Sequence, residues 1–465
     1  MLRPILAFSV LSTAVAAQVS FVHLGTVDVS TTSTTSNPEF VGTNPSAVAW
    51  NGTTLWVAGF YNLGTPGTTA ICRIDNPLSP TPTFNAAFGV LPTPGLRGYS
   101  GLDVSGGLLV AAWDSGTSAP EGIRAYDLAG NQLWQKDARG SSGVGIDPGF
   151  PGLGGDGVGW TTIGSGRRAL QDATTGADVY TLAAGPNAGM IVQPAGLNTT
   201  IWRDMDFDSF SGDIYLRKEN QLIGGLRIGP NDVINMTEIV PVTPGQFINI
   251  QNVAFVRQAA QQFCVWNDRS VGTGNQPFED VIRATRPDGT ELTIDYGTFI
   301  APAGVGAYDF SYDAASSTLA IVDFAAREVH SFAVSSFVEY GTGCPGAGGV
   351  FPRLTGSGDT RPNGAITYTV IDAAPLSIGL FAFGNSMTSV PLPFPAACPL
   401  HVTPVVLLAG AFVTGPGAPG TGTGSVVVPV PPGTSGAVLT CQGVMLEGGS
   451  LATVRTTNGV EVTVQ

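Results

Sequence analysis

Polar and apolar residues alternate in three short runs along Ile201–Ile228, and residues typical of turns separate the runs. Asp204–Asp208 and Asp213–Lys218 each alternate with a period of two, and Leu222–Ile228 forms the third run. That period is the period of a β-strand with one buried face. Ser209–Gly212 supplies small residues for a turn between the first two runs. The stretch therefore predicts one antiparallel β-meander.

The same succession of runs and turns recurs in six units of about fifty residues between Asn44 and Val334. Repeats of this size, each forming a meander, are typical of a β-propeller. We therefore predict an all-β chain with a six-bladed β-propeller over residues 18–336. A seven-bladed ring, with one unit divided wrongly within Gly140–Gly196, is the alternative. The first runs of the six units are Pro45–Trp50, Tyr99–Val104, the glycine-rich Gly152–Gly159, Asp204–Asp208, Gln251–Val256 and Ala307–Tyr312.

The sixth unit contains only three runs, one fewer than a complete blade needs. Val19–Val29 lies before the repeats and has the pattern of a strand. We expect this segment to supply the fourth strand of the sixth unit. Such closure would protect strand edges that an open array leaves exposed.

The pattern changes at Phe337, beyond which charge nearly disappears. Short apolar runs separated by Pro and Gly turns predict a small antiparallel β-sandwich over residues 337–465. These runs are Ile366–Ile371, Ser377–Gly384, Pro404–Val413, Gly424–Pro431, Ala437–Met445 and Val460–Val464.

This C-terminal segment resembles a domain found on many secreted planctomycete proteins. The resemblance covers about the last 125 residues. It rests on the Tyr340-Gly-Thr-Gly-Cys-Pro-Gly346 opening, on Gly384-Asn-Ser386 and Leu392-Pro393, on Cys398-Pro-Leu400, and on Thr457-Asn-Gly-Val460. It implies an exported accessory module that follows variable N-terminal domains, and it implies no catalytic residue. Cys441 is not part of the pattern. The repeats resemble more loosely the divergent blades of secreted bacterial propellers, which implies a fold and no activity.

The charge balance narrows the choice of partners. Lys and Arg number 20 against 34 Asp and Glu, so the net charge is −14. Nucleic-acid binding depends on neutralising phosphates, so we expect no nucleic-acid partner. The 63 Gly and 34 Pro residues fit many short strands joined by turns.

The first residues have the organisation of a secretory signal peptide. Arg3 supplies a positive charge, Ile5–Val15 is apolar, and Ala14–Ala17 offers small residues for cleavage before Gln18. The apolar run is shorter than the ~20 residues that a membrane-spanning helix needs. We therefore expect residues 1–17 to be removed and the protein to be secreted or to lie at the cell surface, without spanning the membrane.

Five cysteines fit an exported protein and leave at least one outside any disulfide. We predict one disulfide, between Cys344 and Cys398. The alternative is that all five are small buried side chains. The redox state of Cys72, Cys264 and Cys441 is left open.

Three carboxylates follow one another at alternate positions in the fourth unit, Asp204, Asp206 and Asp208. Alternate residues of a strand share a face, and clustered oxygen ligands suit Ca²⁺. The calcium-loop motif is not met, because Ser209 stands where it requires Gly and Tyr215 where it requires Glu. Calcium is thus a candidate cofactor, and carboxylates bonded to turn amides or to Arg203 are the plainer interpretation.

The mouth of the central channel of a propeller is the second candidate region for a catalytic or ligand-binding site. Asp103, Asp204 and Asp309 lie near the starts of first strands, and Asp103 and Asp309 are candidate general acid or base residues. Trp202, Arg203 and Asp204 are candidate ligand-binding residues. The tryptophans of the repeats could stack on sugars, but bulky aromatics more often fill space between sheets. No nucleophile elbow or phosphate loop is present in the sequence.

Two functional hypotheses follow. The first is an exported, non-catalytic, monomeric protein that recognises a glycan, a peptide or an envelope protein through one propeller face. The second is an extracellular hydrolase or lyase that acts on carbohydrate or lactone with channel carboxylates, with calcium as a candidate cofactor. A purely structural matrix component is a third interpretation.

Overall fold

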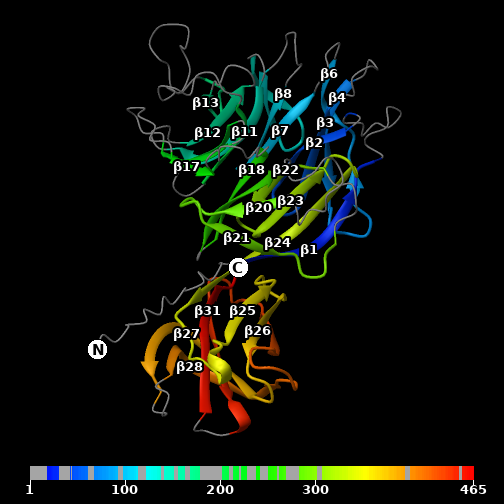
Figure 1. Ribbon diagram of the computed structural model, residues 1–465. Helices are drawn as coiled ribbons and strands as arrows, with labels where there is room; N and C mark the ends of the chain where they lie inside the picture. The colour runs from blue at the N-terminus through cyan, green and yellow to red at the C-terminus, as the bar shows by residue number, and fades with distance from the viewer. Residues whose placement is uncertain are drawn as a thin grey trace, which may run out of the picture.

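The computed structural model shows an all-β protein (Figure 1). It describes residues 18–30, 42, 44–60, 68–92, 98–113, 122–137, 141–150, 155–162, 168–177, 202–208, 213–218, 221–227, 237–240, 250–258, 261–268, 282–300, 306–392, 398–449 and 453–465. Within these ranges there is no α-helix, only the short 3₁₀ turns Ala347–Gly349 and Glu447–Gly449. No described helix could therefore cross a membrane.

The N-terminal part consists of successive groups of antiparallel strands, and the fifth and sixth groups belong to one larger sheet that continues into the C-terminal part. The first sheets are β2–β6 (Asn44–Trp50, Thr54–Phe60, Thr68–Asp75, Thr83–Phe84, Phe88–Pro92), β7–β10 (Tyr99–Ser105, Leu108–Trp113, Gly122–Asp127, Gln132–Asp137) and β11–β13 (Ser141–Phe150, Gly155–Thr162, Arg168–Asp172). Next come β14–β17 (Trp202–Phe207, Asp213–Lys218, Gln221–Arg227, Thr237–Val240), β18–β21 (Ile250–Arg257, Gln262–Asp268, Ile282–Thr285, Glu291–Asp295) and β22–β24 (Ala307–Asp313, Thr318–Asp323, Glu328–Tyr340).

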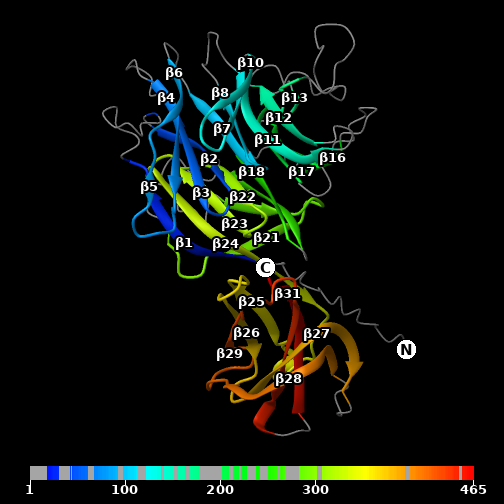
Figure 2. The ribbon, with the colours of Figure 1, turned by 180° about the vertical axis from the view of Figure 1, so that it is seen from behind.

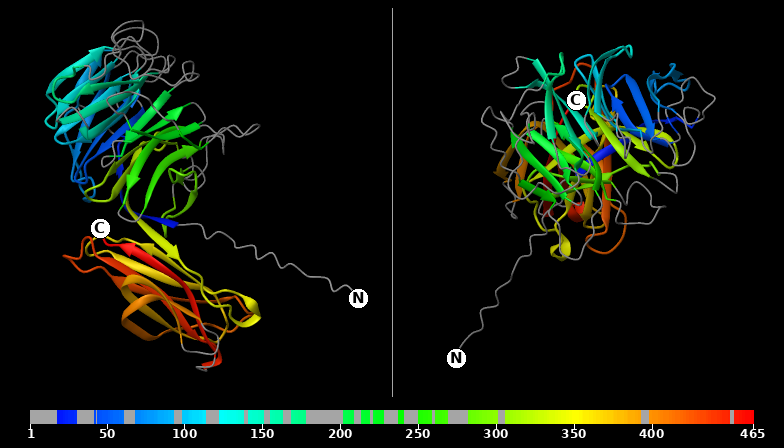
Figure 3. Two further views of the ribbon diagram at one scale, coloured as in Figure 1. Left: turned by 90° about the vertical axis from the view of Figure 1, so that its left-hand side faces the viewer. Right: turned by 90° about the horizontal axis from the view of Figure 1, so that it is seen from above.

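The first strands of these sheets lie around a common centre. β2 contacts β7, and contacts continue through β11, β14, β18 and β22 back to β2. Figure 3, right, shows the sheets spread around this centre. Apolar side chains fill the space between neighbouring sheets. The core between the fifth and sixth sheets, for example, contains Phe263, Val265, Leu319 and Phe332.

β1 (Gln18–Asp28) joins the sixth sheet as its fourth strand. It pairs antiparallel with β24 from Gln18 opposite Phe337 to Asp28 opposite Glu328. It also pairs in parallel with β21 over a short stretch that ends at Ser20. Val19 and Phe21 are fully buried against the fifth sheet. The prediction that the N-terminal segment completes the last unit is confirmed.

The third unit differs from the prediction. Its first strand is β11, and the described part of the glycine-rich run predicted as the first strand, Gly155–Gly159, lies in the second strand, β12. Gly159 shows why the run accepts so many glycines: a Cβ there would lie 2.6 Å from Phe207 of the next sheet. The run predicted at Asp178–Leu182 lies outside the described residues. The short strands β5, β6 and β17 were not predicted.

The C-terminal part contains two further groups of strands (Figure 2). β27 (Ile378–Pro391), β28 (Pro399–Val413), β30 (Val438–Leu446) and β31 (Val454–Thr463) form one sheet in the order β31-β30-β27-β28. β25 (Arg353–Gly358), which was not predicted, β26 (Ala365–Ala373) and β29 (Gly422–Pro429) form the other. Buried side chains of both sheets, including Leu354, Tyr368, Phe381 and Val460, make one core.

β24 runs from the N-terminal part into the C-terminal part without a break (Figure 3). Its last residues pair with β31, from Phe337 opposite Val462 to Tyr340 opposite Gly459. The predicted boundary at Phe337 therefore lies inside a strand. The chain ends at this junction (Figure 1), where Ser317 Oγ donates to Gln465 Oε1 at 2.6 Å.

Candidate functional site

The three carboxylates predicted near the channel lie on first strands: Asp103 on β7, Asp204 on β14 and Asp309 on β22. Asp206, predicted as a candidate calcium ligand, also lies on β14. Asp204 and Asp309 are buried, and Asp103 and Asp206 are partly exposed. We call these four side chains the carboxylate ring. Each of them accepts a hydrogen bond from the backbone of the next first strand around the centre.

Asp309 joins the sixth sheet to the first and to the fifth. Val48 N–H of β2 donates to Asp309 Oδ2 at 2.8 Å. Asn252 Nδ2 of β18 donates to Asp309 Oδ1 at 3.0 Å. Two residues further along both strands, Trp50 N–H of β2 donates to Ser311 Oγ of β22 at 2.9 Å. The bonds that complete the ring of sheets are thus made by side chains of β22.

The other carboxylates repeat this arrangement. Ile146 N–H of β11 donates to Asp103 Oδ2 at 2.6 Å. Val253 N–H and Phe255 N–H of β18 donate to Asp204 Oδ2 at 2.8 Å and to Asp206 Oδ2 at 2.6 Å. The pattern follows from strand geometry, because each first strand pairs with a strand on one edge only. The N–H groups on its other edge need acceptors, since a buried amide without one is costly.

Asp208 continues the series in a different way. It is 1% exposed and forms a two-point ion pair with Arg257. Arg257 lies two residues after Phe255 on β18. The three alternate carboxylates of the fourth unit therefore all bind the fifth sheet. Among the described residues, no group of three His, Cys, Asp or Glu side chains could hold a metal ion. The side chains of Trp202 and Arg203 lie outside the described set.

The carboxylate ring holds its protons more tightly than ordinary aspartates do. Burial raises the pKa of Asp103 to about 6 and that of Asp309 to about 8. Burial, and then the negative charge of Asp309, raise the pKa of Asp204 well above its usual value. Burial and Asp103 do the same for Asp206. Where one of these carboxylates is ionised, its negative charge opposes ionisation of its neighbour.

The described tryptophans fill the spaces between sheets. Trp50, Trp56, Trp113, Trp134 and Trp266 are at most 9% exposed. Trp50 Nε1 donates to Thr318 Oγ1 of the sixth sheet at 2.6 Å, and Trp266 Nε1 donates to Thr285 Oγ1 at 2.9 Å. The described tryptophans therefore pack between sheets, as the second interpretation predicted, and do not offer a surface for stacking on sugars.

Two histidines that are far apart in the sequence meet where β1 pairs with β24. Thr26 Oγ1 lies 3.0 Å from His23 Nε2 and 2.9 Å from His330 Nδ1. Glu328 Oε2 lies 3.4 Å from His330 Nε2. Burial, and then His23, lower the pKa of His330 to about 4. His330 is therefore neutral at physiological pH and acts as a hydrogen-bonding group within the closing strand pair.

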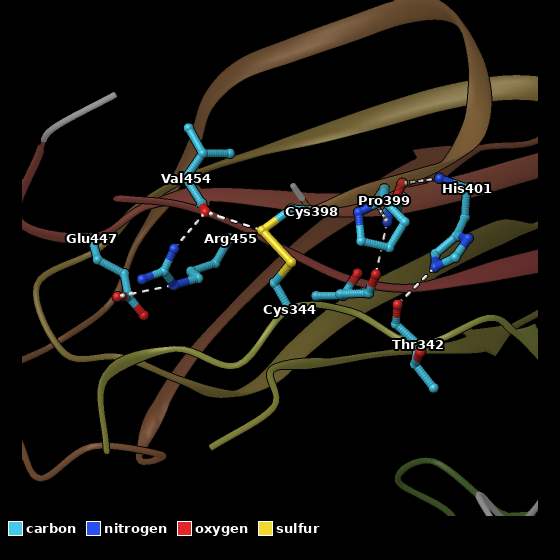
Figure 4. Close-up of a disulfide and its surroundings, with 10 residues drawn as sticks. Thr342, Cys344, Cys398, Pro399, His401, Glu447, Val454 and Arg455 are labelled. Carbon is cyan, nitrogen blue, oxygen red and sulfur yellow. Dashed lines mark hydrogen bonds and ion pairs between the residues drawn. A yellow bond between two sulfur atoms is a disulfide. The ribbon is translucent and has the colours of Figure 1, made fainter. Parts of the chain in front are cut away.

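Cys344 and Cys398, the pair named from the sequence, are joined by a disulfide in the structure (Figure 4). The bond ties the loop after β24 to the start of β28. Beside it His401 Nε2 donates to the carbonyl of Thr342 at 2.8 Å. Gly341 is required there, because it has φ of +68° and a Cβ would lie 2.5 Å from the His401 ring. Cys72, Cys264 and Cys441 are buried thiols.

An open cleft of about 570 Å³ lies along β20 and β21 in the fifth sheet. Its lining combines apolar and charged side chains: Tyr296 and Phe299 are the aromatic residues, and Arg283, Glu291 and Asp295 carry charge. Arg283 Nε lies 3.9 Å from Glu291 Oε1. This volume lies in the range of small-ligand sites. Sequence reasoning missed the cleft because its residues meet only through the pairing of β20 with β21 and the turn that follows.

No protein-family model and no curated protein matches this chain. Solved structures resemble it distantly. An auxiliary nutrient binding protein from Bacteroides thetaiotaomicron aligns at 10% identity and a TM-score of 0.42, over 63% of this chain and 69% of that one. A putative phosphatase from the same organism gives 12% and 0.43, over 63% and 71%. The β-propeller domain of Myceliophteria thermophila Cps50 (Swd1) gives 10% and 0.38, over 62% and 83%. These neighbours include named β-propellers, and similarity at this level carries no argument about function.

Proposed function

We propose that this protein is an exported, non-catalytic binding or surface-associated protein that recognises a glycan, a peptide or an envelope protein through its N-terminal part. One observation carries the proposal. The candidate acid and base groups of the carboxylate ring are already engaged by backbone amides of the neighbouring sheets. A general acid or base needs a substrate proton within hydrogen-bonding reach. Carboxylates that join sheets are poorly available for that role.

The cleft along β20 and β21 is the recognition site in this proposal. Its partly exposed Phe299 offers an aromatic surface for a sugar ring or an apolar side chain, whereas Tyr296 is buried in the core between the fifth and sixth sheets. Arg283 and Asp295 offer a donor and an acceptor beside them. A soluble ligand with both hydroxyl or amide groups and an apolar face fits this lining.

The architectural part of the proposal is a six-bladed β-propeller at 18–336 followed by an antiparallel β-sandwich at 337–465. The closed series of contacts from β2 through β22 supports six blades. The two groups of strands around one core support the sandwich. The resemblance of residues 337–465 to modules of secreted planctomycete proteins, and the signal-like residues 1–17, support export.

The hydrolase or lyase hypothesis is retained as a second candidate because one observation favours it. Burial raises the pKa of Asp309 to about 8, and the negative charge of Asp103 adds to this shift. A protonated carboxyl at neutral pH could act as a general acid. On this hypothesis Asp309→Asn would abolish turnover of a carbohydrate or lactone substrate.

The test is thermal unfolding of the chain from Gln18 onward with a panel of soluble cell-wall glycans and peptides, with Ca²⁺ and with EDTA. A ligand at 100 times its Kd adds about 2.7 kcal/mol to the free energy of unfolding. We expect a rise with one class of glycan or peptide and none with Ca²⁺. Phe299→Ala and Arg283→Ala should weaken that ligand's binding at least tenfold. Phe351→Ala, at a 54% exposed phenylalanine of the C-terminal part, should leave it unchanged.

Two results would contradict the proposal. Turnover of any panel member that is lost in Asp309→Asn would establish the enzyme hypothesis. Ligand binding that is unchanged in both cleft variants would place the recognition site elsewhere on the N-terminal part.

A further inference from the structure

Two histidines from opposite ends of the N-terminal part meet at one hydroxyl group, where β1 pairs with β24 (Figure 1). His23 lies on β1, and His330 lies on β24 opposite Thr26. His23 Nε2 and His330 Nδ1 lie 3.0 Å and 2.9 Å from the same atom, Thr26 Oγ1. The centroids of the two imidazole rings are 6.0 Å apart. We call His23 and His330 the histidine pair.

Aromatic and apolar side chains surround the histidine pair. The ring centroid of Phe299 lies 4.4 Å from that of His23 and 5.5 Å from that of His330. The ring of Phe332 lies 5.5 Å from His23, and Ile321 of β23 stands opposite His330. The His330 side chain is only 1% exposed. A proton taken up here creates a charge with little hydration, which is costly.

One carboxylate can compensate such a charge. Glu328 Oε2 lies 3.4 Å from His330 Nε2. Asp28 of β1 and Asp323 of β23 stand opposite Glu328 on its two sides. Burial, and then Asp323 and Asp28, raise the pKa of Glu328. Glu328 therefore becomes neutral at a higher pH than an ordinary glutamate, so acid removes the compensating charge while it protonates the histidines.

The other elements packed against the histidine pair carry few charged or titratable residues. These are Arg327 in the turn before β24, Glu291 and Asp295 on β21, and Tyr296 directly after β21. Glu291 and Asp295 alternate with Leu292 and Ile294, which pack into the core, so the two carboxylates point to the opposite face of β21. Tyr296 contacts Phe332 edge to face. Among the described residues of these elements, Glu328 is thus the carboxylate paired with His330.

β1 is also part of the frame of the cleft. It pairs in parallel with β21, where Val19 stands opposite Ile294. Ile294 and Phe299 line the cleft, and Phe299 is the ring that packs against His23. The strand that carries one histidine of the pair therefore also holds one wall of the cleft.

We propose that the histidine pair is an acid-sensitive device: when both histidines take up protons, β1 separates from β24 and from β21, and the wall of the cleft opens. At neutral pH the uncharged pair and Thr26 hold β1 in place. Two imidazolium ions at this separation repel one another, and their burial leaves them little hydration. After separation both histidines lie in water. Only the consequence for the cleft rests on the proposed function; the release of β1 does not.

The direction of the effect follows from the pKa values of the pair. Burial, and then His23, lower the pKa of His330 to about 4, and burial lowers the pKa of His23. In the separated strand the ordinary value of about 6.5 applies. A lowered pKa stabilises the closed state above that value, and this stabilisation is lost as the pH falls from about 6.5 toward 4. For His330 alone, a fall from pH 7 to pH 5 raises the equilibrium constant for separation of β1 about twentyfold.

The test is hydrogen–deuterium exchange of the chain from Gln18 onward at pH 7 and pH 5, read by mass spectrometry and corrected for the intrinsic effect of pH on exchange. We expect the equilibrium constant for separation of β1 to be at least tenfold larger at pH 5, and β21 to follow β1. β8, in the second sheet, is the internal reference and should show no such rise. The measurement needs no ligand, so it decides on the release of β1 even where no ligand of the cleft is found, a result that contradicts the proposed function alone.

Three variants assign the effect to the histidine pair. His330→Gln keeps hydrogen-bonding groups and cannot take up a proton, so it should reduce the rise to less than threefold. His23→Gln should reduce the rise as well, because it removes the second charge. His401→Gln is the matched control: His401 is 6% exposed and is bonded to Thr342 in the C-terminal part, so the rise should stay as in the wild type. The raised pKa of Glu328 acts in the opposite direction. Glu328 is present in every variant, so the differences between them report on the histidines.

The proposal is overturned by a wild-type β1 whose corrected exchange is the same at both pH values. It is overturned equally by a rise that the folded histidine variants leave undiminished, or that His401→Gln diminishes as much. A rise of β8 as large as that of β1 also overturns it, because acid would then unfold the N-terminal part as a whole. A rise in β1 without one in β21 overturns the link to the cleft. Circular dichroism shows whether each variant is folded, and His23→Gln, at a partly exposed position, decides the matter where His330→Gln does not fold.

Discussion

At the scale of single residues, the aspartates of the first strands have another role than the one predicted from the sequence. The carboxylates were predicted as candidate catalytic, ligand-binding or calcium-binding groups. In the structure Asp103, Asp204, Asp206 and Asp309 each accept a hydrogen bond from a backbone amide of another sheet, and Asp208 pairs with the Arg257 side chain. The sequence held a signal for this role. Leu102-Asp-Val104, Met205-Asp-Phe207 and Tyr308-Asp-Phe310 place Asp between apolar residues in the first strands of different units. A residue repeated with the unit is more easily explained by the architecture than by one active site.

Asp309 gives the prediction at this scale. Asp309→Ala removes the acceptor of Val48 N–H and should lower the free energy of unfolding by about 1–3 kcal/mol. Asp309→Asn keeps an acceptor and should cost much less. The raised pKa of Asp309 (about 8) adds a pH dependence. Its contribution to stability is present below the unfolded-state pKa of about 3.9 and is lost as the pH rises through 8.

Urea unfolding at pH 5, 7 and 9 measures this effect. The wild type should lose stability between pH 5 and 9, and Asp309→Asn should lose less. Asp288→Asn is the control, because that exposed carboxylate accepts from Thr290 N–H at 2.9 Å, which lowers its pKa. Parallel pH profiles for wild type and Asp309→Asn would contradict the assignment of the carboxyl as a buried, protonated group.

At the scale of elements, the strand that completes the sixth sheet comes from the other end of the repeats. β1 pairs with β24 along ten residues and buries Val19 and Phe21 between the fifth and sixth sheets. The alternating pattern of Val19–Val29 and the missing run of the sixth unit made this predictable. The assignment of β11 was not predictable in the same way, because Ser141–Phe150 has few strand-forming residues and owes its conformation to β12 and to neighbouring sheets.

Removing β1 should therefore open the N-terminal part. A chain that starts at Thr31 leaves the edge of β24 unpaired and exposes the core around Phe332. We expect it to aggregate or to unfold at a midpoint at least 10 °C lower. A synthetic peptide of residues 18–30, added during refolding, should restore part of the stability, and a scrambled peptide should not. A truncated chain with an unchanged midpoint in calorimetry would show that β1 is dispensable.

At the scale of the whole molecule, the two parts of the chain share one sheet. β24 pairs with β1 and β23 in the N-terminal part and with β31 in the C-terminal part. The C-terminal Gln465 is bonded to Ser317 and to Thr360, one on each side of the junction. A continuous strand between the parts makes it difficult for either part to unfold alone.

We therefore expect a single calorimetric transition for the whole chain. Cys344→Ser/Cys398→Ser removes a disulfide that spans 54 positions, which by chain-entropy arguments is worth about 4 kcal/mol. The single transition should move to lower temperature as a unit. A reducing agent should lower the midpoint of the wild type and leave that of the double variant unchanged. Two resolved transitions, of which only one responds to the disulfide, would mean that the parts unfold independently.

The sequence by itself determined the β class, the meander in most units, the closing strand and the change of character near Phe337. These features depend on local alternation and on turn residues, which a chain displays wherever it folds. Only the tertiary structure decided what the charged and apolar side chains do. The carboxylates act as hydrogen-bond acceptors because backbone amides of neighbouring first strands have no strand partner on that edge. The residues of the cleft come together because β20 pairs with β21. His23 and His330 meet at Thr26 because of the register of β1 against β24, which the tertiary structure sets and the local pattern does not.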